Sequence, residues 1–226
     1  MTHVLSPGRT VRRSLLVGSV IAAGVVATAI GVNGASAAAP PGSACVVSIG
    51  VTQTPTTVTG DSANNTIDCG GASSGKTING NGGNDTITGT VFVDTINGND
   101  GDDTMTGGIG NDVLTGANGD DTMTGSAGDD SLTGGNGIDT MTGSEGNDTV
   151  TGEANNDTLN GGVDNDNLDG GNGADTINGD AGDDSLTGPP GDLTVDKLNG
   201  GAGTDVCQSG GLLILLFRDS LTACNP

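Results

Sequence analysis

The sequence predicts an all-β solenoid, in which short strands and glycine-rich loops repeat along a single axis. From Gly71 to Thr187 a unit of nine residues occurs thirteen times in succession, always with Gly at position 1 and an aliphatic residue or Met at position 8. Glycine supplies 44 of the 226 residues, far above the usual share of about 7%, and it does not follow the period of three that is typical of collagen. The only aromatic residues are two Phe, so a conventional core is excluded and the repeat is what predicts an ordered structure.

The charge of the chain favours cations as its ligands. The formal net charge is −22, from 28 Asp plus Glu against 6 Lys plus Arg. This balance argues against direct binding to nucleic acid or to an anionic membrane surface. The single His is His3, and the chain has no Trp or Tyr. We therefore do not expect an enzyme, because the repeat offers only Asp residues as candidates for acid–base catalysis.

Residues 1–37 have the three parts of a secretory signal peptide. Three Arg residues precede an apolar run from Leu15 to Val32, and Ala-Ser-Ala at 35–37 offers small residues for cleavage. The alternative is a permanent membrane anchor, because the run reaches the lower limit of length for spanning a membrane. Its Gly and Ala content and the adjoining cleavage sequence favour removal. We therefore expect a secreted, extracellular protein and no stable membrane insertion of the mature chain.

The rest of the chain divides into three parts by composition. Residues 38–59, rich in Pro, Thr and Val, form an N-terminal lead-in or cap. Residues 60–208 form the repeat array, which opens with a degenerate unit and contains, after Gly188, a unit lengthened by three residues. Residues 209–226 form a C-terminal cap that includes the apolar stretch Leu212–Phe217. We expect this stretch to cover the last turn of the solenoid, the alternative being a segment that binds a membrane or a partner.

Each unit combines a loop and a strand. Positions 7–9, such as Thr86-Ile87-Thr88, suit a very short strand whose middle side chain faces the interior while its neighbours face water. Positions 1–6 carry Gly where the backbone turns through conformations that other residues avoid. They carry Asp or Asn where short polar side chains tolerate such turns.

Position 6 is Asp in twelve consecutive units, from Asp85 to Asp184. Units such as Gly80–Thr88 (GNGGNDTIT) and Gly170–Asn178 (GGNGADTIN) resemble the RTX, or haemolysin-type calcium-binding, repeat GGxGxDxUx. The resemblance covers about Gly60 to Gln208 and implies a right-handed parallel β-roll with two nonapeptides per turn. Residues 18 apart would then stack on one edge of the roll, in strands about 4.8 Å apart.

Such stacking requires a cation between the carboxylates. Asp85 and Asp103, at a separation of roughly 5 Å and an effective dielectric constant of about 20, would repel one another by ~3 kcal/mol. The ligands on offer are carboxylate and carbonyl oxygens, which select calcium over zinc or copper. We expect roughly eight to eleven calcium ions per chain. The expected metal-binding residues are Asp85, Asp103, Asp121, Asp139, Asp157 and Asp175 on one edge, and Asp112, Asp130, Asp148, Asp166, Asp184 and Asp205 on the other.

The second edge begins irregularly. Lys76 takes the Asp position of its first unit, and Val91-Phe92-Val93 fills the loop of the next. We expect these first turns to lack metal. Asn155 and Asp164 replace Gly at position 4 of their units, which is a departure from the family pattern.

The four Cys residues predict two disulfides, because an exported chain is oxidised. The array between Cys69 and Cys207 would be about 30 Å tall at ~4.8 Å per turn, whereas bridged Cα atoms lie about 5.5 Å apart. Of the three pairings, only Cys45 with Cys69 and Cys207 with Cys224 satisfies this limit. Each disulfide would hold a small cap at one end of the roll.

We expect a calcium-binding repeat protein that folds on binding extracellular calcium and acts as a structural or surface-binding module. The alternative is a protein that binds ice, a glycan or a mineral through a flat Thr-x-Thr face on one sheet. This face would be formed by Thr86 and Thr88, Thr104 and Thr106, Thr122 and Thr124, Thr140 and Thr142, Thr158 and Asn160, and Thr176 and Asn178. The simpler interpretation is that Thr is a favourable residue on exposed strands.

Overall fold

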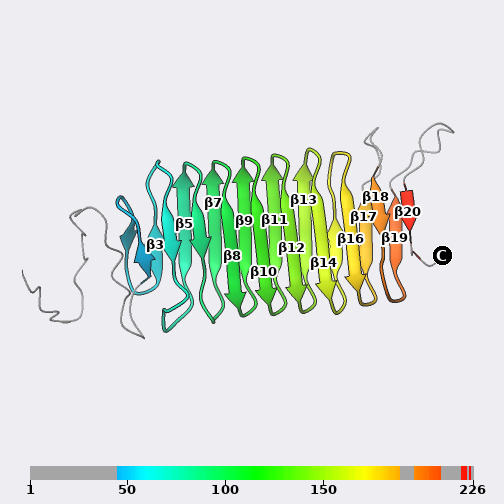
Figure 1. The fold of residues 1–226 in the computed structure, drawn as a ribbon, viewed down its shortest axis with the longest axis horizontal. Helices are drawn as coiled ribbons and strands as arrows, with labels where there is room; N and C mark the ends of the chain where they lie inside the picture. The colour runs from blue at the N-terminus through cyan, green and yellow to red at the C-terminus, as the bar shows by residue number, and fades with distance from the viewer. Residues whose placement is uncertain (1–44, 189–195, 210–219, 223, 225–226) are drawn as a thin grey trace, which may run out of the picture.

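The computed structural model describes residues 45–188, 196–209, 220–222 and 224. These residues contain no helix and form an elongated β-roll, in which two parallel sheets run the length of the molecule from β1 to β20 (Figure 1). The predicted fold class is confirmed. Since no helix is present in the described part, none is available there to cross a membrane.

The strands alternate between two ten-stranded sheets. Sheet A consists of β1 (Val46–Val47), β4 (Thr66–Asp68), β6 (Thr86–Thr88), β8 (Thr104–Ile109), β10 (Thr122–Ala127), β12 (Thr140–Glu145), β14 (Thr158–Val163), β16 (Thr176–Ala181), β18 (Lys197–Asn199) and β20 (Ser220–Thr222). Sheet B consists of β2 (Thr52–Gln53), β3 (Thr57–Thr59), β5 (Thr77–Gly82), β7 (Thr95–Asp100), β9 (Val113–Asn118), β11 (Ser131–Asn136), β13 (Thr149–Ala154), β15 (Asn167–Asp169), β17 (Ser185–Gly188) and β19 (Val206–Ser209).

The register of both sheets is 18 residues through the regular array. Thr104 pairs with Thr122, and Thr122 pairs with Thr140, on three consecutive strands of sheet A. Two nonapeptides therefore make one turn, and the stack contains about 8 turns. After β16 the register lengthens, because Thr176 pairs with Lys197. The three extra residues of that unit are thus accommodated between β17 and β18 without disturbing the pairing of either sheet.

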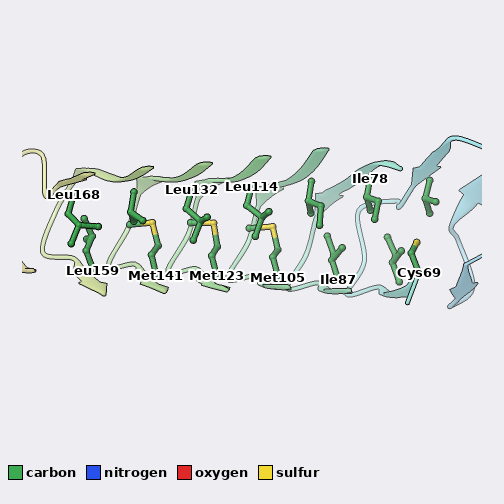
Figure 2. Close-up of a cluster of buried hydrophobic side chains, with 14 of the residues drawn as sticks. Cys69, Ile78, Ile87, Met105, Leu114, Met123, Leu132, Met141, Leu159 and Leu168 are labelled. Carbon is green, nitrogen blue, oxygen red and sulfur yellow. The ribbon is translucent and has the colours of Figure 1, made fainter. Parts of the chain in front are cut away.

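The core is one column of side chains from each sheet. Position 8 is buried in the described units from Ile67 to Leu198 and half-buried at Cys207 in the last, so the prediction that it faces the interior is confirmed. Figure 2 shows Met105, Met123 and Met141 from sheet A packed against Leu114 and Leu132 from sheet B. Because each strand contributes a single large apolar side chain, the core is thin, and the polar edges must supply part of the stability.

The strands are longer than predicted. In most turns a strand has six residues, as in β8, and covers positions 7–9 of one unit and positions 1–3 of the next. The prediction of three-residue strands was therefore wrong for these turns. The parallel ladder continues through position 1, because this Gly faces the interior and the chain turns only at positions 4–6.

Disulfides hold both ends of the roll, in the predicted pairing. Cys45 is bonded to Cys69 with a Cα–Cα distance of 4.2 Å, and Cys207 is bonded to Cys224 with a Cα–Cα distance of 5.7 Å. At the N-terminal end, β1 pairs antiparallel with β4, and β2 pairs antiparallel with β3. The predicted signal peptide at 1–37 and the apolar stretch Leu212–Phe217 lie outside the described residues.

Candidate metal sites

The Asp at position 6 points into the roll at the edge where one sheet passes to the other. All twelve predicted metal-binding Asp residues are buried, with exposed fractions of 0% to 3%. The inward direction follows from strand alternation, because position 6 lies two residues before the buried position 8. The structure thus places these carboxylates in two columns, one along each edge, in which neighbours are 18 positions apart except for Asp184 and Asp205, which are 21 apart.

One oxygen of each carboxylate joins adjacent turns. The backbone N–H of Asp85 donates to Oδ1 of Asp103 at 2.7 Å, and that of Asp103 donates to Oδ1 of Asp121 at 2.7 Å. The same bond continues across the lengthened unit, where the N–H of Asp184 donates to Oδ1 of Asp205 at 3.1 Å. These bonds fix one side of each carboxylate and leave the other side facing the interior.

The second oxygen, Oδ2, is buried and accepts no hydrogen bond in most of the two columns. Among the described residues this holds for Asp85, Asp103, Asp112, Asp121, Asp130, Asp139, Asp148, Asp157, Asp166, Asp184 and Asp205. A buried carboxylate oxygen without a partner is costly, so each of these atoms needs a positively charged or donor group.

The Gly at position 1 keeps the space beside each Oδ2 open. A Cβ atom on Gly80 would lie 2.2 Å from Oδ2 of Asp85 and 2.8 Å from the carbonyl oxygen of Gly98. The same pair of oxygens surrounds Gly116, at 2.2 Å for Asp121 and 2.7 Å for Gly134. A carboxylate oxygen of one turn and a carbonyl oxygen of the next therefore converge on one small cradle. Two acceptors that face each other in this way need a cation or a hydrogen-bond donor beside them.

Burial raises the pKa of these carboxyls. The value is about 6 for Asp103, Asp112 and Asp148, and about 7 for Asp121, Asp130, Asp157 and Asp166. Burial is the largest cause of the raised pKa of Asp121, and the carboxylates of Asp103 and Asp139 add to it. The N–H bond from the preceding turn opposes the rise. The ionised column is therefore under electrostatic stress that a bound cation would relieve.

A family model described as the RTX calcium-binding nonapeptide repeat (4 copies) matches residues 79–114, 97–132, 106–141, 115–150, 133–168 and 160–192. These matches together cover residues 79–192, which is half of the chain. The chain belongs to the RTX calcium-binding repeat family. Comparison with curated proteins gave no match.

The donor set fits the calcium ion that RTX repeats bind. Oxygen atoms alone line each cradle, and hard oxygen ligands suit calcium. The described residues contain no group of three or more His, Cys, Asp and Glu side chains that could hold a metal by themselves. An RTX site in this chain would therefore combine a carboxylate with backbone carbonyls, as the cradles at Gly80 and Gly116 do.

The two departures from the RTX pattern at position 4 keep the positive φ of that position. Asn155 and Asp164 have φ values of 81° and 75°, whereas most Gly residues at the equivalent position have φ between 120° and 157°. Asn and Asp tolerate this conformation better than other residues with a Cβ atom. In the same two units, Oδ2 of Asp157 and Oδ2 of Asp166 are buried and accept no hydrogen bond, like the other carboxylate oxygens named above.

A second polar column at position 5 was missed in the sequence. Oδ1 of Asp102 accepts the N–H of Asp120 at 3.0 Å, and Oδ1 of Asp120 accepts the N–H of Ile138 at 2.8 Å. These exposed side chains bond toward the C-terminal end, whereas the position 6 side chains bond toward the N-terminal end. Position 5 is Asn or Asp in most units, and this composition could have indicated the column. The tolerance of both residues for turns explains the composition equally well, so bonding between turns did not follow from it.

The first loops of the RTX array are built differently. Lys76, at position 6 of its unit, is buried and donates from Nζ to the carbonyl oxygen of Pro55 at 2.7 Å and to Oγ of Ser74 at 3.0 Å. Both oxygens of Asp94 accept hydrogen bonds, Oδ1 from the N–H of Lys76 and Oδ2 from the N–H of Thr90. Asp94 therefore differs from the eleven Asp residues named above, because it has hydrogen-bond donors at both oxygens.

Proposed function

We propose that this chain is a secreted protein that folds when it binds extracellular calcium and then serves as a structural or surface-binding module. The proposal includes roughly eight to eleven calcium ions held along the two carboxylate columns. It also assigns the chain no catalytic role, because the Asp residues that could act as acids or bases are committed to these columns.

The observation that carries the proposal is the set of buried Oδ2 atoms that face a carbonyl oxygen of the next turn. Each such pair is unfavourable without a cation and favourable with one. A core of one apolar side chain per strand cannot offset many such buried charges. Calcium would therefore bind the rolled state and not the unfolded chain, which couples binding to folding.

A calcium titration followed by circular dichroism tests this proposal. In excess EGTA we expect the spectrum of an unfolded chain, and at millimolar calcium a cooperative change to a β-sheet spectrum. A control titration with magnesium should give little change, because magnesium needs a smaller octahedral site and sheds its water reluctantly. An unchanged β-sheet spectrum in EGTA would contradict calcium-coupled folding.

A second candidate function rests on the outer face of sheet A. The structure pairs Thr86 with Thr104 and Thr88 with Thr106, and it extends these two columns through β10 and β12. Such regular columns would match a repeating ligand, namely ice, a glycan or a mineral surface. On sheet B the equivalent of Thr122 is Val113 or Ser131, so the repeat itself does not impose Thr there.

Thermal hysteresis and ice recrystallisation test the ice-binding form of this candidate. The calcium-loaded protein should be active and a Thr122→Lys variant should be much weaker, because a long charged side chain would interrupt both columns. Equal inactivity of both proteins would leave the Thr columns as ordinary sheet surface.

A further inference from the structure

Two loops near the N-terminal end satisfy their position 6 side chain without a cation. In the loop of residues 60–65, the N–H of Asp61 donates to Oδ1 of Asn65 at 2.9 Å. In the loop of residues 89–94, the N–H of Thr90 donates to Oδ2 of Asp94. In both cases the donor is the backbone amide of position 2 in the same unit.

The other loops have position 2 in a different conformation. The φ angle is positive at Asn81, Asn99, Gly108, Ala117, Ser126, Gly135, Ser144, Glu153, Gly162, Gly171, Asp180 and Gly201. Each of these residues is position 2 of a unit whose Asp is one of the twelve predicted metal-binding residues. Asp61 and Thr90 are not among the residues with positive φ. The φ angle of position 2 thus separates the loops of the twelve predicted metal-binding residues from the loops of Asn65 and Asp94, in which the position 2 amide donates to the position 6 side chain.

The carbonyl group of position 1 changes direction together with that amide. In the array, the carbonyl oxygen of Gly107 lies 2.1 Å from a Cβ atom built on Gly89, inside the cradle of the turn before, where Oδ2 of Asp94 lies at 2.7 Å. The cradle of Asp94 thus has the same two acceptors as the others, and it differs in the N–H that Thr90 donates to Oδ2. The carbonyl oxygen of Gly60 instead accepts a hydrogen bond from Nδ2 of Asn81 at 2.7 Å. A Cβ atom on Gly71 meets no atom within 4 Å, so the carbonyl of Gly89 does not enter the corresponding space.

One peptide group, between positions 1 and 2, therefore has two orientations. With its N–H turned inward it supplies a donor to the position 6 side chain. With its carbonyl turned inward, it adds a second acceptor oxygen beside the carboxylate of the preceding turn. Seven of the position 2 residues with positive φ have a Cβ atom, for which this region is unfavourable. Such a conformation persists where another interaction holds it.

We propose that the orientation of this peptide decides which loops take a cation. The loops at 60–65 and 89–94 use the N–H in place of the cation and close the N-terminal end of both carboxylate columns. All loops with a left-handed residue at position 2 take calcium. This inference rests on the proposed function. It adds to that function that position 2 determines which loops bind calcium, and that the loops at 60–65 and 89–94 fold without metal.

The first test compares Asp94 and Asp112, which occupy the same position in successive turns of one edge. Isothermal titration of the full-length chain with calcium chloride gives the number of ions bound. We expect Asp94→Asn to bind as many ions as the unmodified protein and Asp112→Asn to bind at least one fewer. Asn retains an Oδ1 acceptor for the N–H of the preceding turn, which is that of Lys76 for Asp94 and that of Asp94 for Asp112, so both variants keep the bond between turns. In Asp94→Asn the N–H of Thr90 loses its acceptor, which is a local change in a loop without calcium.

The second test changes position 2 itself. Ala117 has a φ of 88°, and a β-branched residue strongly disfavours that region. We expect Ala117→Val to weaken one calcium site by at least about tenfold, whereas Ala117→Gly, the matched control, binds calcium as tightly as the unmodified protein. Circular dichroism in saturating calcium checks that each variant is folded.

The outcomes separate this inference from the proposed function. If the unmodified protein takes up no calcium, the proposed function itself fails. If it takes up calcium but Asp94→Asn loses as many ions as Asp112→Asn, the inference about the peptide is overturned. The same holds if Ala117→Val and Ala117→Gly bind calcium equally.

Discussion

The Gly at position 1 is required by space and not by backbone conformation. Gly116 is absent from the residues with positive φ, yet a Cβ atom there would lie 2.2 Å from Oδ2 of Asp121 and 2.7 Å from the carbonyl oxygen of Gly134. We expect Gly116→Ala to destabilise the calcium-loaded protein by about 1 to 3 kcal/mol, as overpacked sites do, and to remove calcium from this cradle. Urea unfolding in saturating calcium measures the change in free energy.

Gly71 offers a matched control for this variant. It also occupies position 1, but a Cβ atom on it meets nothing within 4 Å, and the residue at position 6 of its unit is Lys76. Gly71→Ala should change the free energy of unfolding by less than about 0.5 kcal/mol. Equal destabilisation by both substitutions would show that Gly at position 1 serves a purpose other than the cradle.

Proton release on calcium binding distinguishes an unfolded metal-free chain from a metal-free roll. Burial raises the pKa of Asp121 and Asp130 to about 7, whereas Asp in an unfolded chain has a pKa of about 4. The metal-free roll therefore holds more protons than the unfolded chain between these values, and its stability falls as the pH rises from about 4 to about 7. A metal-free roll would have to lose these protons when it binds calcium, whereas the unfolded chain that we expect in EGTA has already lost them.

We accordingly expect calcium binding of similar strength at pH 6 and at pH 8, with few protons released at pH 6. Titration calorimetry in two buffers of different ionisation enthalpy gives the number of protons released. Weaker binding at pH 6, with protons released, would show that the metal-free chain keeps the roll and its buried, protonated carboxyls.

At the scale of the strand, the nine-residue period determines most of what could be predicted. The side chains of Ile87 and Met105 had to face inward, because alternation in a strand leaves one inward position between two Thr residues. The stacking of Thr104 on Thr122 followed from two units per turn. The length of the strands did not follow, because glycine is rare in strands and nothing in the sequence shows that the ladder continues through Gly107.

The orientation of the loop peptides could not be predicted from the sequence either. Position 2 contains Asn, Ala, Ser, Glu, Asp and Gly in loops of one conformation, so residue type does not report the positive φ. The two columns of buried Asp could be predicted from the nine-residue period, and the irregular loop of Asp94 from the Val91-Phe92-Val93 stretch beside it. The hydrogen bond from Thr90 that pairs its second oxygen needed the coordinates.

The Met column gives a probe of the strands in solution. Met105, Met123 and Met141 are at most 1% exposed on three successive strands of sheet A (Figure 2). In calcium, dilute hydrogen peroxide should leave all three unoxidised, and in EGTA it should oxidise all three at the rate of a free Met side chain, because unfolding exposes them. Peptide mass spectrometry measures each site. Protection of these residues in EGTA would mean that the sheets persist without calcium.

At the scale of the whole molecule, the two disulfides restrict the unfolded chain, whereas the two carboxylate columns affect the stability of the folded roll. The pairing of Cys45 with Cys69 and of Cys207 with Cys224 closes short loops at opposite ends of the roll (Figure 1). These bonds restrict the unfolded ensemble only locally, since the long array between them stays unconstrained. Its order must therefore come from stacking and from the cations along its edges.

The size of the chain in solution separates cation coordination from simple charge screening. An unfolded chain of this length has a radius of gyration of about 50 Å, and a compact one of about 17 Å, with a larger value for an elongated roll. At 1 M sodium chloride the Debye length is about 3 Å, so the repulsion between exposed carboxylates is largely screened. Sodium would screen the repulsion that comes from the net charge of −22 in the unfolded chain, without bridging the Oδ2 and carbonyl oxygens inside the cradles.

We therefore expect small-angle X-ray scattering to show an expanded chain in EGTA with 1 M sodium chloride, and a radius of gyration less than half as large in millimolar calcium. Full compaction by sodium chloride in EGTA would show that net charge alone keeps the chain unfolded, and the oxygens of the cradles would then need no bound ion.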